Sequence, residues 1–186
     1  MNPTVANFKW TDVGTITNRC VVEACAQATY VWTGVAPTDA QVDQAQNEFS
    51  GSAEDIKALE GFCDRGVCGT KAFGYALIST DAQIKQAIDM SGCAMLGMAM
   101  FEGVGPHMVL AISYTPEFVN VVSWGAVYSL SWADHAANKN SSYALFRSFD
   151  WHWIWWNMLY NRYVWAGMAF VPAVAAAAWK FWSMFG

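Results

Sequence analysis

A hairpin-like pattern in the middle of the chain constrains the fold more than any other stretch. The apolar run His107–Tyr114 has the length of a strand, and the turn sequence Thr115-Pro116-Glu117 follows it. A second β-rich run, Phe118–Trp124, then returns. Antiparallel pairing brings the start of the first run next to the end of the second. The pattern therefore predicts that His107 lies beside Ser123, and a histidine held by a polar neighbour can act as a general base.

A cysteine opens the first predicted helix, far upstream of this histidine. The helix is expected to run from Arg19 to Thr33 and to stop at Gly34, with Asn18 as its N-cap. Cys20 then lies in the first turn, where unpaired N–H groups and the helix dipole favour a thiolate over a thiol. Cys20 and His107 are therefore a candidate nucleophile and base.

The remaining pattern predicts helices first and antiparallel strands later, which is typical of an α+β domain with segregated layers. Two capping boxes, at Thr38/Gln41 and at Thr80/Gln83, each open a helix. The other predicted elements are a helix capped by Ser52, a strand over Phe73–Ile78, a buried strand over Cys93–Met100, a strand over Val127–Leu130, a helical turn over Trp132–Ala137 and a last strand over Ser142–Phe149.

Charge divides the chain near residue 150. All acidic residues lie at or before Asp150, and residues 151–186 hold only Arg162 and Lys180 as basic residues. The stretch Tyr163–Trp179 has no charge, tryptophans flank it, and Lys180 can snorkel, so it is just long enough for a membrane-spanning helix. A long apolar helix packed against a partner protein explains the stretch equally well. We therefore predict a globular domain over residues 1–150 and a hydrophobic, aromatic helical tail over 151–186.

Composition excludes several functional classes. The chain has a net charge of −5 and no basic run, which argues against nucleic-acid binding. Five cysteines without a repeated CxxC pattern argue against a zinc site, and we expect neither a metal nor a cofactor. Cys63 and Cys68 are two buried thiols or a local disulfide. The N-terminus has no basic start and no apolar run, so no signal peptide is expected.

The order of these motifs resembles the papain-like (C1-type) cysteine peptidases, and most closely the small papain-like proteins of bacteria and phages. The resemblance covers about residues 10–149 and leaves the tail outside it. It rests on a helix that begins with a cysteine and ends in Trp-Thr (Cys20 to Thr33) and on a His-x-Val strand (His107 to Val109). A strand that ends in Ser-Trp-Gly follows (Ser123 to Gly125), and the motifs Leu-x-Trp (Leu130 to Trp132) and Tyr-Ala (Tyr143-Ala144) come last.

The resemblance implies a role for each site residue. Cys20 would be the nucleophile, His107 the base that takes its proton, and Trp124 the shield of the histidine. Papain-type enzymes orient this histidine with an asparagine just before Ser-Trp-Gly, where this chain has Val122. Either Asn120 or Ser123 would have to replace it.

The oxyanion donor also departs from the pattern. Papain-type enzymes carry a glutamine shortly before the cysteine, and none is present here. Asn18 and the backbone N–H of Cys20 are the expected substitutes. An alternative alignment makes Cys25 the nucleophile, although it would lie inside the helix.

The sequence also predicts the burial of several other ionisable and apolar residues. Glu23 is expected to be a solvated helix residue, and His135 and His152 to lie at the surface or at an interface. Met95, Met98 and Met100 are expected in the core.

Three functions fit these patterns. The first is a cysteine peptidase or amidase tethered by its C-terminal tail. The second is a degenerate papain-like domain that serves as a structural part of a larger assembly, such as a phage virion, with the tail docking into protein partners or membrane. The third is a peripheral membrane protein whose globular domain is a spacer. Association with a membrane or a virion is expected in each case.

Overall fold

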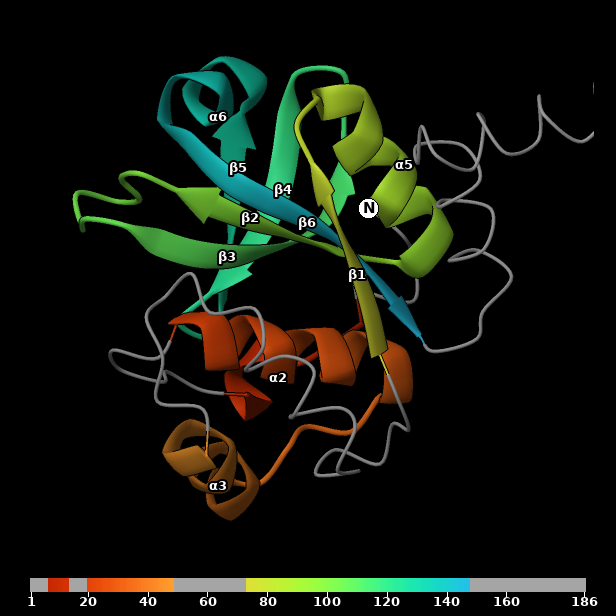
Figure 1. Ribbon diagram of the computed structural model, residues 1–186, viewed down its shortest axis with the longest axis vertical. Coiled ribbons are helices and arrows are strands. Elements are labelled where there is room, and N and C mark those ends of the chain that lie inside the picture. The colour runs from red at the N-terminus through yellow and green to blue at the C-terminus, as the bar shows by residue number, and fades with distance from the viewer. Residues whose placement is uncertain (1–6, 14–19, 49–72, 148–186) are drawn as a thin grey trace, which may run out of the picture. The chain divides into compact units, whose positions relative to one another are not determined.

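The computed structural model describes residues 7–13, 20–48 and 73–147 (Figure 1). All of them belong to the first of two compact units, Met1–Ser148. The predicted helix after Ser52, the cysteines Cys63 and Cys68, the N-cap Asn18 and the tail 151–186 lie outside the described residues. The assignment of the tail as a separate helical segment therefore stays a prediction.

The described chain is an α+β fold built on one six-stranded antiparallel sheet. Its strands follow the order β1-β6-β2-β3-β4-β5. Their bounds are β1 Phe73–Ile78, β2 Ala94–Met98, β3 His107–Tyr114, β4 Phe118–Ser123, β5 Ala126–Ser131 and β6 Lys139–Arg147. The last strand therefore returns to the middle of the sheet and pairs with both β1 and β2.

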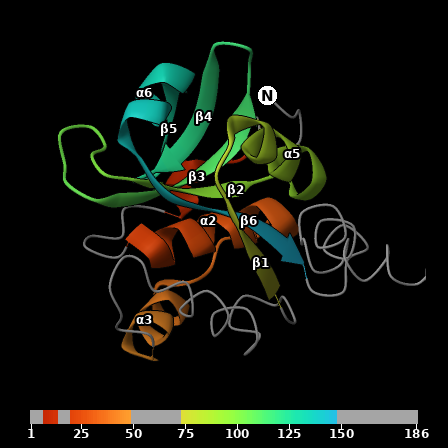
Figure 2. The same ribbon diagram turned by 45° about the horizontal axis from the view of Figure 1, so that its top comes forward.

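Helices cover both faces of this sheet. The 3-10 helix η1 (Trp10–Asp12) and the helices α2 (Cys20–Thr33) and α3 (Asp39–Glu48) precede the sheet in the chain. Figures 1 and 2 show α2 across one face and α5 (Asp81–Ser91) on the other, while α6 (Trp132–Asn138) joins β5 to β6. The predicted α+β class with an antiparallel sheet is confirmed, although α5 and α6 lie between strands in the chain.

Local signals explain where α5 begins and ends. Thr80 accepts a hydrogen bond from the backbone of Gln83, and the Gln83 side chain accepts one from the Thr80 backbone, which is the predicted capping box. The helix ends at Gly92, which has a φ of 80° that glycine adopts without steric cost. Ile84, Ala87 and Ile88 of α5 are buried.

The central helix α2 is buried on every side rather than along one stripe. All residues from Val21 to Tyr30 are buried, including three polar ones, Glu23, Gln27 and Thr29. The apolar residues of α2 pack in a single core cluster with Met108, Leu110 and Ile112 of β3 and with Val122 of β4. A helix that is buried all round belongs to the interior of a domain, so packing on every side holds the side chains of α2 in place.

The close approach of β2 and β6 requires a glycine. The β2–β6 register shifts between Leu96 and Met98. A Cβ atom on Gly97 would lie 2.4 Å from the carbonyl oxygen of Ser141. No side chain fits at this bulge, which lies at the end of the sheet where β3 begins.

Three burial predictions were wrong. Glu23 was expected in solvent and is 1% exposed, and His135 was expected at the surface or at an interface and is also 1% exposed, inside the domain. Met100 was expected in the core and is 55% exposed, because β2 ends at Met98 and the chain leaves the sheet there. Met95 and Met98 are buried as predicted.

Candidate active site

The β3–β4 hairpin brings His107 and Ser123 together. The register pairs Leu110 with Val122, so Ser123 lies opposite Val109 and diagonally across from His107, the first residue of β3. The His107 Nε2 and the Ser123 Oγ are 2.8 Å apart, and both side chains are buried. This pair is the contact that the sequence predicted from the hairpin.

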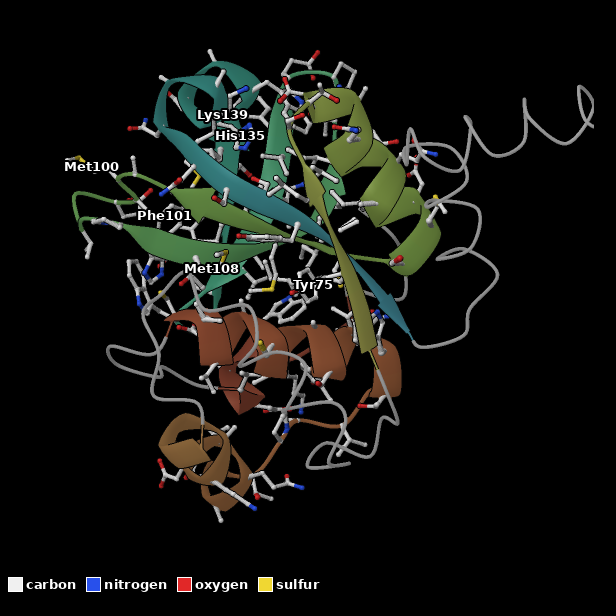
Figure 3. All side chains as sticks on the ribbon, in the orientation of Figure 1. Tyr75, Met100, Phe101, Met108, His135 and Lys139 are labelled. Carbon is white, nitrogen blue, oxygen red and sulfur yellow. The ribbon has the colours of Figure 1, made fainter. Side chains whose placement is uncertain are left out.

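Aromatic rings enclose the His107 imidazole. Phe101, on the connection between β2 and β3, stacks on it with ring centres 5.5 Å apart and planes at 8°. The Trp124 ring lies 4.7 Å away on a tilted plane, and Tyr128 of β5 contacts both Phe101 and Trp124. Figure 3 shows Phe101 at this end of the sheet and Met108, the residue after His107, between β3 and α2. Burial among these groups lowers the pKa of His107, so the ring is neutral at physiological pH and keeps one lone pair for a proton.

Asn120 does not contact this histidine. Its side-chain nitrogen donates to the Ser113 hydroxyl at 3.0 Å, and its oxygen accepts from the Ser129 hydroxyl at 2.8 Å. Both partners lie on the strands that flank β4, and the β3–β4 register shifts between Ala111 and Ser113. Asn120 and Ser123 were the two residues expected to orient His107 in place of the asparagine of papain-type enzymes. Of these two, Ser123 is the one that bonds to His107.

The structure reveals a third buried polar residue at this place, Glu23 of α2. Its Oε1 accepts hydrogen bonds from the backbone N–H of Trp124 and from the Gln27 side chain. Burial raises the pKa of Glu23 to about 7, although these two bonds and a backbone hydrogen bond from Gly125 oppose the shift. Its Oε2 is buried without a partner among the described residues. Glu23 thus joins the central helix to the turn that follows Ser123.

Cys20 is the first described residue of α2 and lies one helical turn before Glu23. Residues three apart on a helix are neighbours on its surface, so Cys20 lies on the same side of α2 as Glu23. The thiol is partly exposed and packs against the core cluster, and within the described ranges no hydrogen bond joins it to His107. Cys25, the alternative nucleophile, is 1% exposed inside this cluster and is not accessible to a substrate.

A small cavity adjoins the histidine. It has a volume of about 20 Å³ and is lined by residues of β2, β3 and β6, including Gly97, His107 and Ser141. A cavity of this size holds about one water molecule. It offers room for a reactant water beside the imidazole but not for a side chain of a substrate.

We predict that replacing Ser123 with alanine affects the histidine selectively. The buried Nε2 would lose its partner, so the free energy of unfolding should fall by about 1–3 kcal/mol. The pKa of His107 should fall further, because the hydroxyl no longer accepts from the protonated ring. NMR titration of the His107 ring measures this shift. Asn120→Ala is the control, since it also removes side-chain hydrogen bonds on β4, one part-buried and one exposed, but should leave the titration of His107 unchanged. Equal shifts in both variants would contradict the assignment.

The described residues hold neither a metal site nor a membrane-spanning helix. No group of three histidine, cysteine or acidic side chains placed to hold a metal ion occurs there. None of the helices in the described ranges is both long and apolar enough to cross a bilayer. The predicted membrane or docking segment, 151–186, lies outside these ranges.

No family model and no curated protein matches the chain. Among solved structures, a periplasmic domain of the EpsAB fusion protein of the Vibrio vulnificus type II secretion system is similar, with a TM-score of 0.39 and 11% sequence identity. The similarity covers 76% of this chain and 51% of that chain, so this chain spans about half of that protein's length. A likeness this distant establishes neither the detailed fold nor the function.

Proposed function

We propose that residues 1–150 form a papain-like domain that performs acyl transfer of the cysteine peptidase or amidase type. One observation carries the proposal: the Ser123 hydroxyl hydrogen-bonds to Nε2 of His107, and no described residue bonds to Nδ1. An imidazole held by one nitrogen presents the other in a fixed direction, as a general base requires. The order of the elements supports the same reading, because a helix that starts at Cys20 packs on the strand that starts at His107.

The proposed reaction uses Cys20 as the nucleophile and His107 as both base and acid. The Nδ1 of His107 takes the proton from the Cys20 thiol, and the sulfur attacks the acyl carbon of the substrate. The C–N bond then breaks, the imidazolium gives its proton to the leaving amine, and a thioester remains on Cys20. Water, deprotonated by the same histidine, hydrolyses the thioester and restores the thiol. The Cys20 backbone N–H and Asn18 would bind the oxyanion, and the Trp124 ring would limit solvent access to the imidazole.

Accessibility supports Cys20 over the other described cysteines as the nucleophile. Cys25 and Cys93 are 1% and 0% exposed, whereas the Cys20 side chain is partly exposed at the end of its helix. A nucleophile must be reached by its substrate, so we expect Cys20 to react and the other two to stay protected.

The test is capture of the acyl intermediate. Incubation with p-nitrophenyl acetate, followed by peptide mapping by mass spectrometry, should place one acetyl group on Cys20. His107→Ala should abolish it, because the thiol then lacks its base, while Asn120→Ala should retain it. Acetylation that is equally slow in the wild type and in His107→Ala would contradict the peptidase-type function.

A second function, a non-catalytic structural part of a larger assembly such as a phage virion, is favoured by one observation. The Cys20 thiol makes no hydrogen bond to His107 among the described residues, and His107 already has a structural partner in Ser123. In that case the tail, 151–186, would dock into protein partners or membrane. The same capture experiment separates the two functions, since a structural domain should show no His107-dependent acylation.

A further inference from the structure

We propose that Glu23 is a positioning residue, which holds the Trp124-Gly125 turn against α2 and thereby keeps Ser123 and the Trp124 ring in place on His107. This inference rests on the proposed function, because the geometry that it maintains is that of the Cys20–His107 site. It assigns a task to a buried acid that the acyl-transfer steps do not use.

The turn between β4 and β5 needs an external contact to hold it. Ser123 pairs with Ala126, so only Trp124 and Gly125 connect the two strands. Both have positive φ, 49° for Trp124 and 71° for Gly125. A two-residue hairpin turn with positive φ at both positions favours Asn-Gly or Asp-Gly, and a bulky residue in the left-handed region is uncommon. The Trp124 conformation is therefore one that its surroundings must impose.

Glu23 supplies the contact. Its carboxylate accepts from the backbone N–H of Trp124, the residue in the unfavourable conformation. Gln27, which is also 1% exposed and lies one turn further along α2, donates to the same oxygen at 3.0 Å and fixes its direction.

This contact connects α2, which holds Cys20, to the turn beside His107. Cys20 and Glu23 lie one turn apart on the same helix, and helix α2 is rigidly buried. The residue before Trp124 bonds to Nε2 of His107, and the Trp124 ring itself packs on the imidazole. A change at Glu23 should therefore reach the histidine through the turn, although no hydrogen bond joins Glu23 to His107 within the described ranges.

Two substitutions of similar size separate the hydrogen bond from the packing. Glu23→Gln keeps an oxygen acceptor for the Trp124 N–H, whereas Glu23→Met removes it. Glu117→Gln is the matched control, since Glu117 is an exposed acid at the turn between β3 and β4. Thermal unfolding identifies any variant that does not fold. NMR then reports the Trp124 amide shift and the pH titration of the His107 ring in each folded protein.

We expect Glu23→Met to move the Trp124 amide upfield and to change the apparent pKa of His107, and we expect Glu23→Gln to restore wild-type values for His107. The control should match the wild type. If Glu23→Met folds and leaves both signals unchanged, or if Glu23→Gln fails to restore the His107 titration that Glu23→Met alters, the positioning role is wrong.

The alkylation rate of Cys20 at pH 6 distinguishes this failure from a failure of the proposed function. A wild-type rate that does not depend on His107 would refute the peptidase-type chemistry, whatever the NMR signals show. If the rate does depend on His107, Glu23→Met should lower it at least tenfold and Glu23→Gln should restore it. A Glu23→Met rate equal to that of the wild type would overturn the positioning role alone.

Discussion

The wild-type protein is expected to lose stability as the pH rises from about 4.5 to 7, and Glu23→Gln is expected not to show this loss. The unfolded chain releases the Glu23 proton near its ordinary value of 4.5, while burial raises the pKa in the folded protein to about 7. Between these values the folded state holds a proton that the unfolded state has lost. The contribution of Glu23 is therefore fully present below pH 4.5 and is lost as the pH rises through 7. The shift corresponds to a change on the order of 3 kcal/mol in the free energy of unfolding.

Urea unfolding of the wild type and of Glu23→Gln at intervals from pH 4 to pH 8.5 measures this effect. The comparison is needed because burial lowers the pKa of both His107 and His135. Their contribution has the opposite sign, since it is lost as the pH falls below about 6.5. Both histidines are present in both proteins, so subtraction isolates Glu23. A difference between the two proteins that stays constant across this range would show that Glu23 is ionised in the folded state as in the unfolded state.

Local sequence signals predicted the elements that carry the site. The capping box at Thr80 and Gln83 forms as predicted, since both of its hydrogen bonds are local. The run from His107 pairs with the run from Phe118, because the turn between them fixes the register of the hairpin. The hairpin pattern predicted that His107 and Ser123 come close, and in the structure their side chains meet diagonally across the two strands.

Contacts between distant segments could not be predicted in this way. Helical periodicity assigned Glu23 to a solvated face, but α2 is covered all round, and the partner of Glu23 lies 101 residues away at Trp124. The sequence also left the choice between Asn120 and Ser123 open, because no local pattern shows that the Asn120 side chain bonds to Ser113 and Ser129. His135 of α6 is buried next to Asp81 of α5, and four strands separate these two helices in the chain. In each case tertiary packing decides the burial of a polar side chain whose local pattern is ambiguous.

Cys20 is expected to react with iodoacetamide at pH 6 on the order of 100 times faster in the wild type than in His107→Ala. An unactivated thiol, with a pKa near 8.5, has less than about 1% thiolate at pH 6. A thiolate paired with an imidazolium is almost fully ionised there, although its lower basicity makes each thiolate somewhat less reactive. The chain also holds Cys63 and Cys68 outside the described residues, so peptide mapping must assign the label to Cys20.

The most direct test of the papain-type site is this alkylation rate measured from pH 4 to pH 9. The proposal predicts rapid labelling of Cys20 in acid that disappears in His107→Ala and persists in Asn120→Ala. A single rise near pH 8.5 that His107→Ala leaves unchanged would contradict it. The second proposed function, a structural part of a larger assembly, would then be favoured, with residues 151–186 as its predicted docking segment.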